Sequence, residues 1–121
     1  LCREYNVKVM FHSCGAIKEI IPDLIDAGFD ILNPVQVRAA GMVPVELKKE
    51  FGEKICFHGG VDVQKTLPYG TVEDVRREVR ERIDILGENG GYILAPTHNF
   101  QADIPVENII AFYKEAGSIN I

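Results

Sequence analysis

The sequence has no tryptophan, only three cysteines and no long apolar run. An odd number of cysteines argues against a disulfide framework and favours buried thiols or a metal site. The apolar runs are a few residues long, far below the ~18 residues that a membrane-spanning helix needs. No basic and apolar leader opens the chain. These absences predict a cytoplasmic protein without a membrane span.

Positive charge is also in deficit. Thirteen Lys and Arg stand against eighteen Asp and Glu, which gives a net charge of -5 and a pI near 5.1. A chain of this charge lacks the broad positive field that holds a nucleic-acid backbone, so no nucleic-acid partner is expected. The apolar share of 46% and the mean hydropathy of +0.01 are typical of a globular domain.

Short apolar runs alternate with amphipathic segments. The predicted strands are residues 7–11, 30–32, 54–57 and 92–95, and the predicted helices are residues 16–27, 44–51, 72–88 and 105–116. Pro22 indicates a kink in the first helix or a late start. Thr71, with Asp74 three residues on, predicts the cap of the third helix. Four successive βα units predict a parallel sheet covered by helices.

Two architectures fit this pattern: an open doubly wound sheet, or half of an eight-stranded βα barrel. No phosphate-binding glycine fingerprint favours the first. The barrel is favoured because polar residues follow the predicted strands, where barrel enzymes build their active sites. These residues are His12, Cys14, Asn33, Gln36, His58, Asp62, Thr97 and His98.

Charged residues crowd the third predicted helix. They are Asp74, Arg76, Arg77, Glu78, Arg80, Glu81, Arg82 and Asp84. Their spacing is typical of a solvated helix face with ion pairs, so no functional role is assigned to them.

His12 and Cys14 form the sharpest candidate site. Alternate residues of an extended segment point the same way, so the imidazole and the thiol lie together as two zinc ligands. His98 is the first choice for a third ligand, because neighbouring barrel strands converge on one rim. Cys56 is a weaker choice, since it lies within a predicted strand. The alternative for the pair is a buried cysteine beside a hydrogen-bonded histidine.

Two further clusters carry polar groups. In residues 57–62, paired glycines allow close approach of a ligand, and Asp62 can orient a histidine or accept a proton. The alternative is a turn in which Asp62 caps backbone amides. In residues 95–101, a polar cluster before the last helix can bind an anionic group at the helix N-terminus. The alternative is that Asn99 and Asp103 shape the turn and cap that helix.

Three segments resemble the uroporphyrinogen decarboxylase superfamily: FHSCG at residues 11–15, FHGGVD at 57–62 and APTHNFQADIPVENI at 95–109. The resemblance covers nearly all of the chain, but only the C-terminal half of such proteins. It implies an α/β fold made of the C-terminal four βα units of a TIM (βα)8 barrel. Residues 1–121 are then expected to form one domain of a half-barrel.

Within that superfamily, the corrinoid-dependent methyltransferases bind zinc through an H-x-C pair, which matches His12 and Cys14. The resemblance implies zinc as a cofactor, with His98 as third ligand where the coenzyme M branch has a cysteine. This difference makes coenzyme M less favoured as acceptor and a methoxy or folate-linked compound more so. Zinc is a Lewis acid, which lowers the pKa of a bound thiol or polarises a methyl ether oxygen.

The same resemblance implies partners and supporting residues. A corrinoid (cobamide) cofactor is expected on a separate carrier protein, beside a small-molecule methyl donor or acceptor. His58 and Asp62 are expected as catalytic residues that orient ligands or move protons, and Thr97 and Asn99 as cofactor-binding residues.

Two alternatives remain open. One is porphyrinogen decarboxylation, a lyase reaction of porphyrin biosynthesis, in which His98 and Asp62 contact the substrate without a metal. The other is a non-catalytic half-barrel. Four parallel strands leave two open sheet edges, so self-association or an N-terminal half that completes the barrel is expected.

Overall fold

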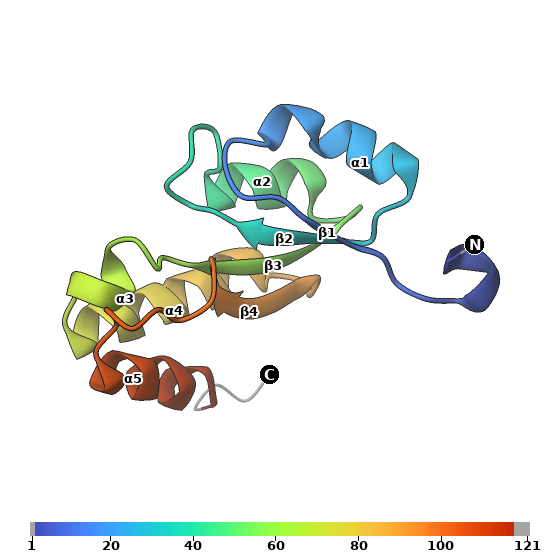
Figure 1. The fold of residues 1–121 in the computed structure, drawn as a ribbon. Helices are drawn as coiled ribbons and strands as arrows, with labels where there is room; N and C mark the ends of the chain where they lie inside the picture. Colours follow the sequence, from blue (N-terminus) through green and yellow to red (C-terminus); the bar gives the residue numbers. More distant parts are fainter. Residues whose placement is uncertain (1, 118–121) are drawn as a thin grey trace.

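The computed structural model describes residues 2–117, in which strands and helices alternate as predicted (Figure 1). The strands are β1 (Met10–His12), β2 (Ile31–Val35), β3 (Cys56–Val61) and β4 (Tyr92–Pro96). The α-helices are α1 (Ile21–Ala27), α2 (Pro44–Phe51), α3 (Thr66–Tyr69), α4 (Val72–Leu86) and α5 (Val106–Gly117). Two short 3-10 helices, η1 (Cys2–Tyr5) and η2 (Lys18–Ile20), complete the set for these residues.

The strands form one parallel sheet in the order β1-β2-β3-β4. Every strand therefore pairs with its neighbour along the chain, unlike a doubly wound sheet, whose strand order reverses at a switch point. Right-handed crossovers in this order place the connecting helices on one face. In Figure 1 the helices follow one another from α1 at the top to α5 at the bottom, in the order of the strands.

The core lies between the sheet and its helices. Leu32 and Phe57 are fully buried and pack in one cluster with Ile21, Leu47 and Phe51 of α1 and α2. A second cluster joins the end of β3 to α4 and α5. Its buried members are Val61, Leu67, Val75, Val79, Ile104, Ala111 and Phe112. Alternate residues of the strands face away from these clusters, and that other face carries the polar side chains of the site.

The strand boundaries differ from the sequence prediction. β1 begins at Met10 instead of residue 7, because its partner β2 begins only at Ile31. β2 continues to Val35 and β3 to Val61, past the polar and glycine residues where the apolar pattern stops. Backbone pairing does not require apolar side chains, so a ladder can outlast its hydrophobic pattern.

The helix predictions hold in position but not in every boundary. α1 starts late, at Ile21 with Pro22 in its first turn, after the short η2. Thr71 and Asp74 form the predicted capping box of α4, which ends at Leu86 and not at residue 88. Between the third predicted strand and the third predicted helix, the structure adds a short helix that was not predicted, α3.

The interpretation of the charged residues of α4 as a solvated face was wrong for two of them. Glu78 is 7% exposed and the side chain of Arg82 is 11% exposed. Glu78 Oε1 accepts a hydrogen bond from the backbone N–H of Asp62, and Arg82 Nε donates to the carbonyl of Gly60. Both side chains turn inward because the end of β3 leaves backbone groups there that need partners.

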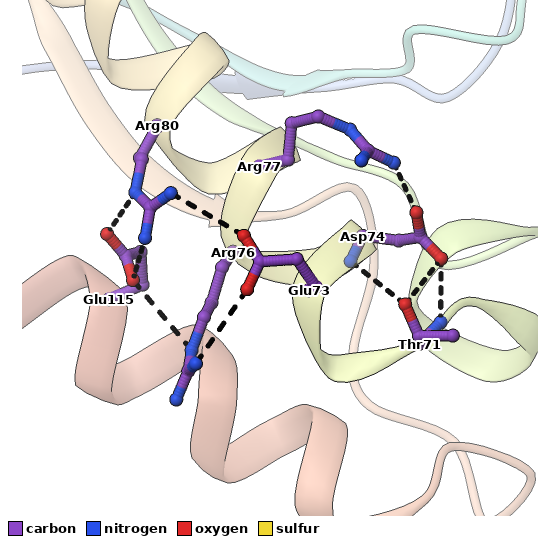
Figure 2. A network of polar contacts seen from close by, with 7 residues as sticks. All are labelled: Thr71, Glu73, Asp74, Arg76, Arg77, Arg80 and Glu115. Atoms are coloured by element: carbon purple, nitrogen blue, oxygen red, sulfur yellow. Dashed lines mark hydrogen bonds and ion pairs between the residues drawn. The ribbon is translucent and has the colours of Figure 1, made fainter.

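Two other charged residues of α4, Arg76 and Arg80, tie the helix to α5 (Figure 2). Arg80 donates two hydrogen bonds to the carboxylate of Glu115, at 2.6 and 3.0 Å. Arg76 lies between Glu73 and Glu115, 3.8 and 4.0 Å from their oxygens. In the described part of the chain, no helix has the length and apolar character to cross a membrane.

Candidate functional site

His12, the last residue of β1, and Cys14 lie side by side at the end of this strand. The Sγ of Cys14 is 3.7 Å from Nε2 of His12, and both side chains are exposed. The turn that follows is held by Gln36, whose side-chain oxygen accepts a hydrogen bond of 2.7 Å from the N–H of Gly15. The backbone of Gly15 has φ +106, a conformation that favours glycine. This turn fixes the thiol beside the imidazole.

Asn33 connects two histidines across three strands. His12 and Asn33 are register partners on β1 and β2. Nδ1 of His12 lies 2.5 Å from Oδ1 of Asn33, and Nδ2 of Asn33 lies 2.5 Å from Nδ1 of His58 on β3. Burial lowers the pKa of His58, which favours its neutral form.

His98 lies across a cavity from this row. A cavity of about 370 Å³ is lined by all three histidines and by Asn33, Thr97 and Asn99, among others. A second cavity, of about 360 Å³, has Cys14, Gln36, Thr97 and His98 in its wall. The ring centroids of His12 and His98 are 6.5 Å apart. The structure thus brings His12, Cys14, His58 and His98 to one region.

The loop that carries His98 is anchored at both ends. Buried Thr97 accepts a hydrogen bond of 3.3 Å from the N–H of Val63, and its own N–H donates to the carbonyl of Val61. Phe100 packs its ring on Phe112 of α5, with centroids 5.7 Å apart. Thr97 therefore ties its loop to the loop after β3, while Asn99 is exposed at the cavity wall.

The structure does not bring Asp62 into this cavity. Its carboxylate is buried, accepts a hydrogen bond of 2.8 Å from the N–H of Gln64, and lies 3.6 Å from Arg38. It lines a separate cavity of about 710 Å³ between α2, α3 and α4. The bond from Gln64 is the backbone cap that was weighed as the alternative for Asp62.

The three cysteines differ in their surroundings. Cys2, Cys14 and Cys56 are all free. Burial raises the pKa of the Cys56 thiol, which disfavours its thiolate form. Cys14 is the exposed thiol that lies beside a histidine.

The His12–Cys14 pair has the spacing of two ligands on one zinc ion. With bond lengths of ~2.3 Å to sulfur and ~2.0 Å to nitrogen, tetrahedral ligand atoms lie about 3.5 Å apart, close to the 3.7 Å between Sγ and Nε2. Two imidazoles on one such ion have ring centres about 5 Å apart, against 6.5 Å for His12 and His98. Among the described residues, no three His, Cys, Asp or Glu side chains are grouped to hold a metal ion.

Asn33 and Gln36 are the site residues whose roles the sequence did not reveal. Both were visible as polar residues after a predicted strand. Their contacts depend on the register between β1 and β2, which brings Asn33 opposite His12. That register has no local signal in the sequence, because it is set by the packing of non-adjacent segments.

Comparison with known proteins identifies the family of the chain. The sequence model of the uroporphyrinogen decarboxylase (URO-D) family matches residues 1–118. The chain belongs to the uroporphyrinogen decarboxylase family. This membership confirms the superfamily resemblance, and with the parallel sheet it places the chain in an enzyme family of α/β fold.

Curated relatives in the same superfamily are methyltransferases. The chain is 28% identical over 106 residues to the methylcobamide:CoM methyltransferase MtaA of Methanosarcina barkeri. It is 27% identical, also over 106 residues, to the same enzyme from the strain Fusaro / DSM 804. Each match covers 88% of this chain and 29% of the relative. The chain thus spans less than a third of the length of the relatives it matches.

Proposed function

We propose that this chain carries the zinc-binding part of the active site of a methyltransferase. The enzyme moves a methyl group between a corrinoid carrier and a small molecule. The observation that supports this most is the pairing of Cys14 Sγ with Nε2 of His12 at 3.7 Å. The Nδ1 of the same ring is engaged by Asn33, so Nε2 is the nitrogen left for a metal. Similarity to a methylcobamide:CoM methyltransferase supports the same interpretation.

The four βα units are proposed to be the C-terminal half of a TIM (βα)8 barrel, with residues 1–121 as one domain. The sequential strand order supports this, since barrel strands follow chain order. The polar face then lines the barrel interior, and the site lies toward the C-terminal ends of the strands, where barrel enzymes act.

In this proposal His12, Cys14 and His98 hold the zinc ion. When bound, zinc acts as a Lewis acid that lowers the pKa of a thiol or polarises an ether oxygen. His98 reaches the ion only if its ring moves about 1–2 Å toward His12, from 6.5 Å to about 5 Å between ring centres. His58 contributes a ring N–H at the cavity wall, where it hydrogen-bonds the substrate or hands on a proton.

The other predicted residues take supporting roles. Thr97 and Asn99 line the cavity of the three histidines and are proposed to contact the corrinoid or the substrate. Asp62 is proposed to act at a distance, by holding the loop after β3 through its bond from Gln64. The carrier protein is proposed to dock at the C-terminal edge of the sheet. A histidine as third ligand favours a methoxy or folate-linked compound over coenzyme M.

Zinc content tests the proposal directly. Purified protein is expected to contain near-stoichiometric zinc by elemental analysis, and the double variant His12→Ala, Cys14→Ala is expected to contain none. His98→Ala should retain zinc more weakly, and lose it first to a chelator. Cys2→Ala is the matched control, because this exposed thiol lies on η1 and should leave the zinc content unchanged.

Absence of zinc in folded wild-type protein would contradict the proposal. Porphyrinogen decarboxylation would then be the better account, which the description of the family favours. In that reaction His98 would contact the substrate without a metal, whereas Asp62 lines a separate cavity. Loss of zinc in Cys2→Ala would place the ion elsewhere and also contradict the site.

A further inference from the structure

One row of three side chains crosses the sheet at right angles to its strands. His12, Asn33 and His58 come from β1, β2 and β3 and are joined by two short hydrogen bonds of 2.5 Å each. Asn33 is half-buried on the polar face and faces away from the core clusters. All three residues line the same cavity of about 370 Å³.

An amide side chain has a fixed direction as a hydrogen-bonding group. Its oxygen only accepts and its nitrogen only donates. The oxygen of Asn33 faces Nδ1 of His12, so this nitrogen must carry a hydrogen. The nitrogen of Asn33 faces Nδ1 of His58, so that nitrogen must be bare.

The two rings are therefore held in opposite tautomers. His12 has its lone pair on Nε2, 3.7 Å from the thiol of Cys14. His58 has its single ring hydrogen on Nε2, and the neutral ring agrees with the pKa that burial lowers. The amide of Asn33 thus leaves a lone pair on Nε2 of His12 and a hydrogen on Nε2 of His58, both at the same cavity.

We propose that Asn33 is a positioning residue that sets the tautomers of His12 and His58, so that one ring binds the metal and the other donates a hydrogen bond to an oxygen of the substrate. The part that concerns His12 as a ligand rests on the proposed function. The tautomers themselves do not, because the contacts that set them are all within this chain.

The tautomers are measured in long-range proton–nitrogen NMR spectra of the metal-free protein, at about pH 8, where free imidazoles are neutral. The chain has three histidines, so His98 serves as an internal reference. The expected spectrum has hydrogen on Nδ1 of His12 and on Nε2 of His58. Hydrogen on Nδ1 of His58 in the wild type would overturn the proposal.

Two substitutions separate positioning from simple structural support. Asn33→Asp places acceptor oxygens beside both rings, so His12 should keep its tautomer while the hydrogen of His58 moves to Nδ1. Asn33→Leu offers neither group, so both rings should lose their fixed tautomers. Lys49→Ala removes an exposed side chain of α2 that lines neither of the two cavities, and it should leave the spectra unchanged. Unchanged tautomers in folded Asn33→Leu or Asn33→Asp would overturn the proposal.

Zinc affinity gives a second readout. Asn33→Leu should weaken zinc binding about 10-fold or more, the usual cost of losing a partner behind a metal-bound histidine. Asn33→Asp should retain most of the affinity, because a carboxylate also accepts from Nδ1 of His12. Equal affinity in both variants would contradict the link to His12. Wild-type protein with the expected tautomers and no zinc would contradict the proposed function and leave the role of Asn33 intact.

Discussion

Glu78 is a carboxylate that lies in the protein interior. Its Oε1 accepts from the N–H of Asp62 and lies 3.3 Å from Arg82. Its Oε2 is buried without a hydrogen-bond partner among the described residues. The side chain holds the end of β3, where the chain turns toward α3, because it satisfies a backbone N–H that is removed from water.

Removal of Glu78 is expected to destabilise the protein strongly. Glu78→Ala leaves the Asp62 N–H and the buried side of Arg82 without their partner, so the free energy of unfolding should fall by about 3 kcal/mol. Glu78→Gln keeps one acceptor oxygen and should lose about 1 kcal/mol. Urea unfolding followed by circular dichroism measures both values.

Glu81 provides the matched control on the same helix. It also pairs with Arg82, at 3.1 Å, but its side chain is 54% exposed. Glu81→Ala should therefore cost less than about 1 kcal/mol. Equal losses for Glu78→Ala and Glu81→Ala would mean that burial of the Glu78–Arg82 pair contributes nothing.

Among the site residues, those defined by local spacing were predictable. His12 and Cys14 were paired because alternate residues of a strand share a face, and the structure places them 3.7 Å apart. Asp62 was predicted to be a catalytic residue of the same site. It lines another cavity, because the chain turns inward after Val61. Spacing along one strand is a local property, whereas the direction of a loop depends on the whole packing.

At the scale of elements, α4 has a well-built start. Thr71 and Asp74 exchange hydrogen bonds, and Arg77 pairs with the same carboxylate, as Figure 2 shows. The Thr71 hydroxyl, the Thr71 N–H and Arg77 together lower the pKa of Asp74 to about 2, from an ordinary value of 3.8. Each of these groups favours the ionised carboxylate.

This shift predicts that the stability of the protein depends on pH in the acid range. Because the folded-state pKa is the lower one, the contribution of Asp74 is complete above about pH 4 and is lost as the pH falls toward about 2. Asp74→Asn should therefore melt at a lower temperature than wild type at pH 7. The difference should shrink below about pH 4 and vanish near pH 2, as thermal melts across this range would record.

Thr71→Ala tests the cause of the effect. Since the Thr71 hydroxyl is the largest contributor to the shift, its removal should reduce the pH-dependent difference that the Asp74→Asn substitution produces. It should also cost about 1 kcal/mol of stability through the lost cap. A difference that persists unchanged in the Thr71→Ala background would place the cause elsewhere.

The order and type of the long elements could be read from the sequence. α2 was predicted with both of its boundaries, because Pro44 suits a first turn and Gly52 suits a helix stop. α3 was missed because its four residues include a proline and complete only one turn. β2 was cut short at residue 32 because Asn33 and Pro34 break an apolar pattern that the backbone pairing does not need.

At the scale of the whole molecule, the sheet has two strands with one neighbour each, β1 and β4. Met10 and Ile93 lie on these edge strands and are 47% and 41% exposed. Unpaired edges with apolar side chains are ready templates for another chain. The same surfaces are those that further βα units would cover in a complete barrel.

The isolated chain is therefore expected to self-associate through these strands. Sedimentation velocity over a range of concentrations should give a mass above that of one 13.5 kDa chain. Ile93→Lys should shift the protein toward the monomer, because a charge on the edge strand opposes pairing. Val106→Lys, at a 66% exposed position on α5, should leave the association unchanged.

The opposite pattern would contradict this expectation. A monomer at every concentration would mean that the open edges do not pair. Association that is sensitive to Val106→Lys and not to Ile93→Lys would place the contact on α5.

The row of His12, Asn33 and His58 has a polarity that runs from one βα unit to the next. With the proposed tautomers, its two bridging hydrogens both point from β1 toward β3, so their bond dipoles align. A positive charge that settles at Nε2 of His12 draws electrons along the row, and aligned hydrogen bonds strengthen one another. The ring N–H of His58 then becomes a better proton donor. A cation bound at His12 on β1 would thus change the chemistry of His58 on β3 without any movement of the backbone.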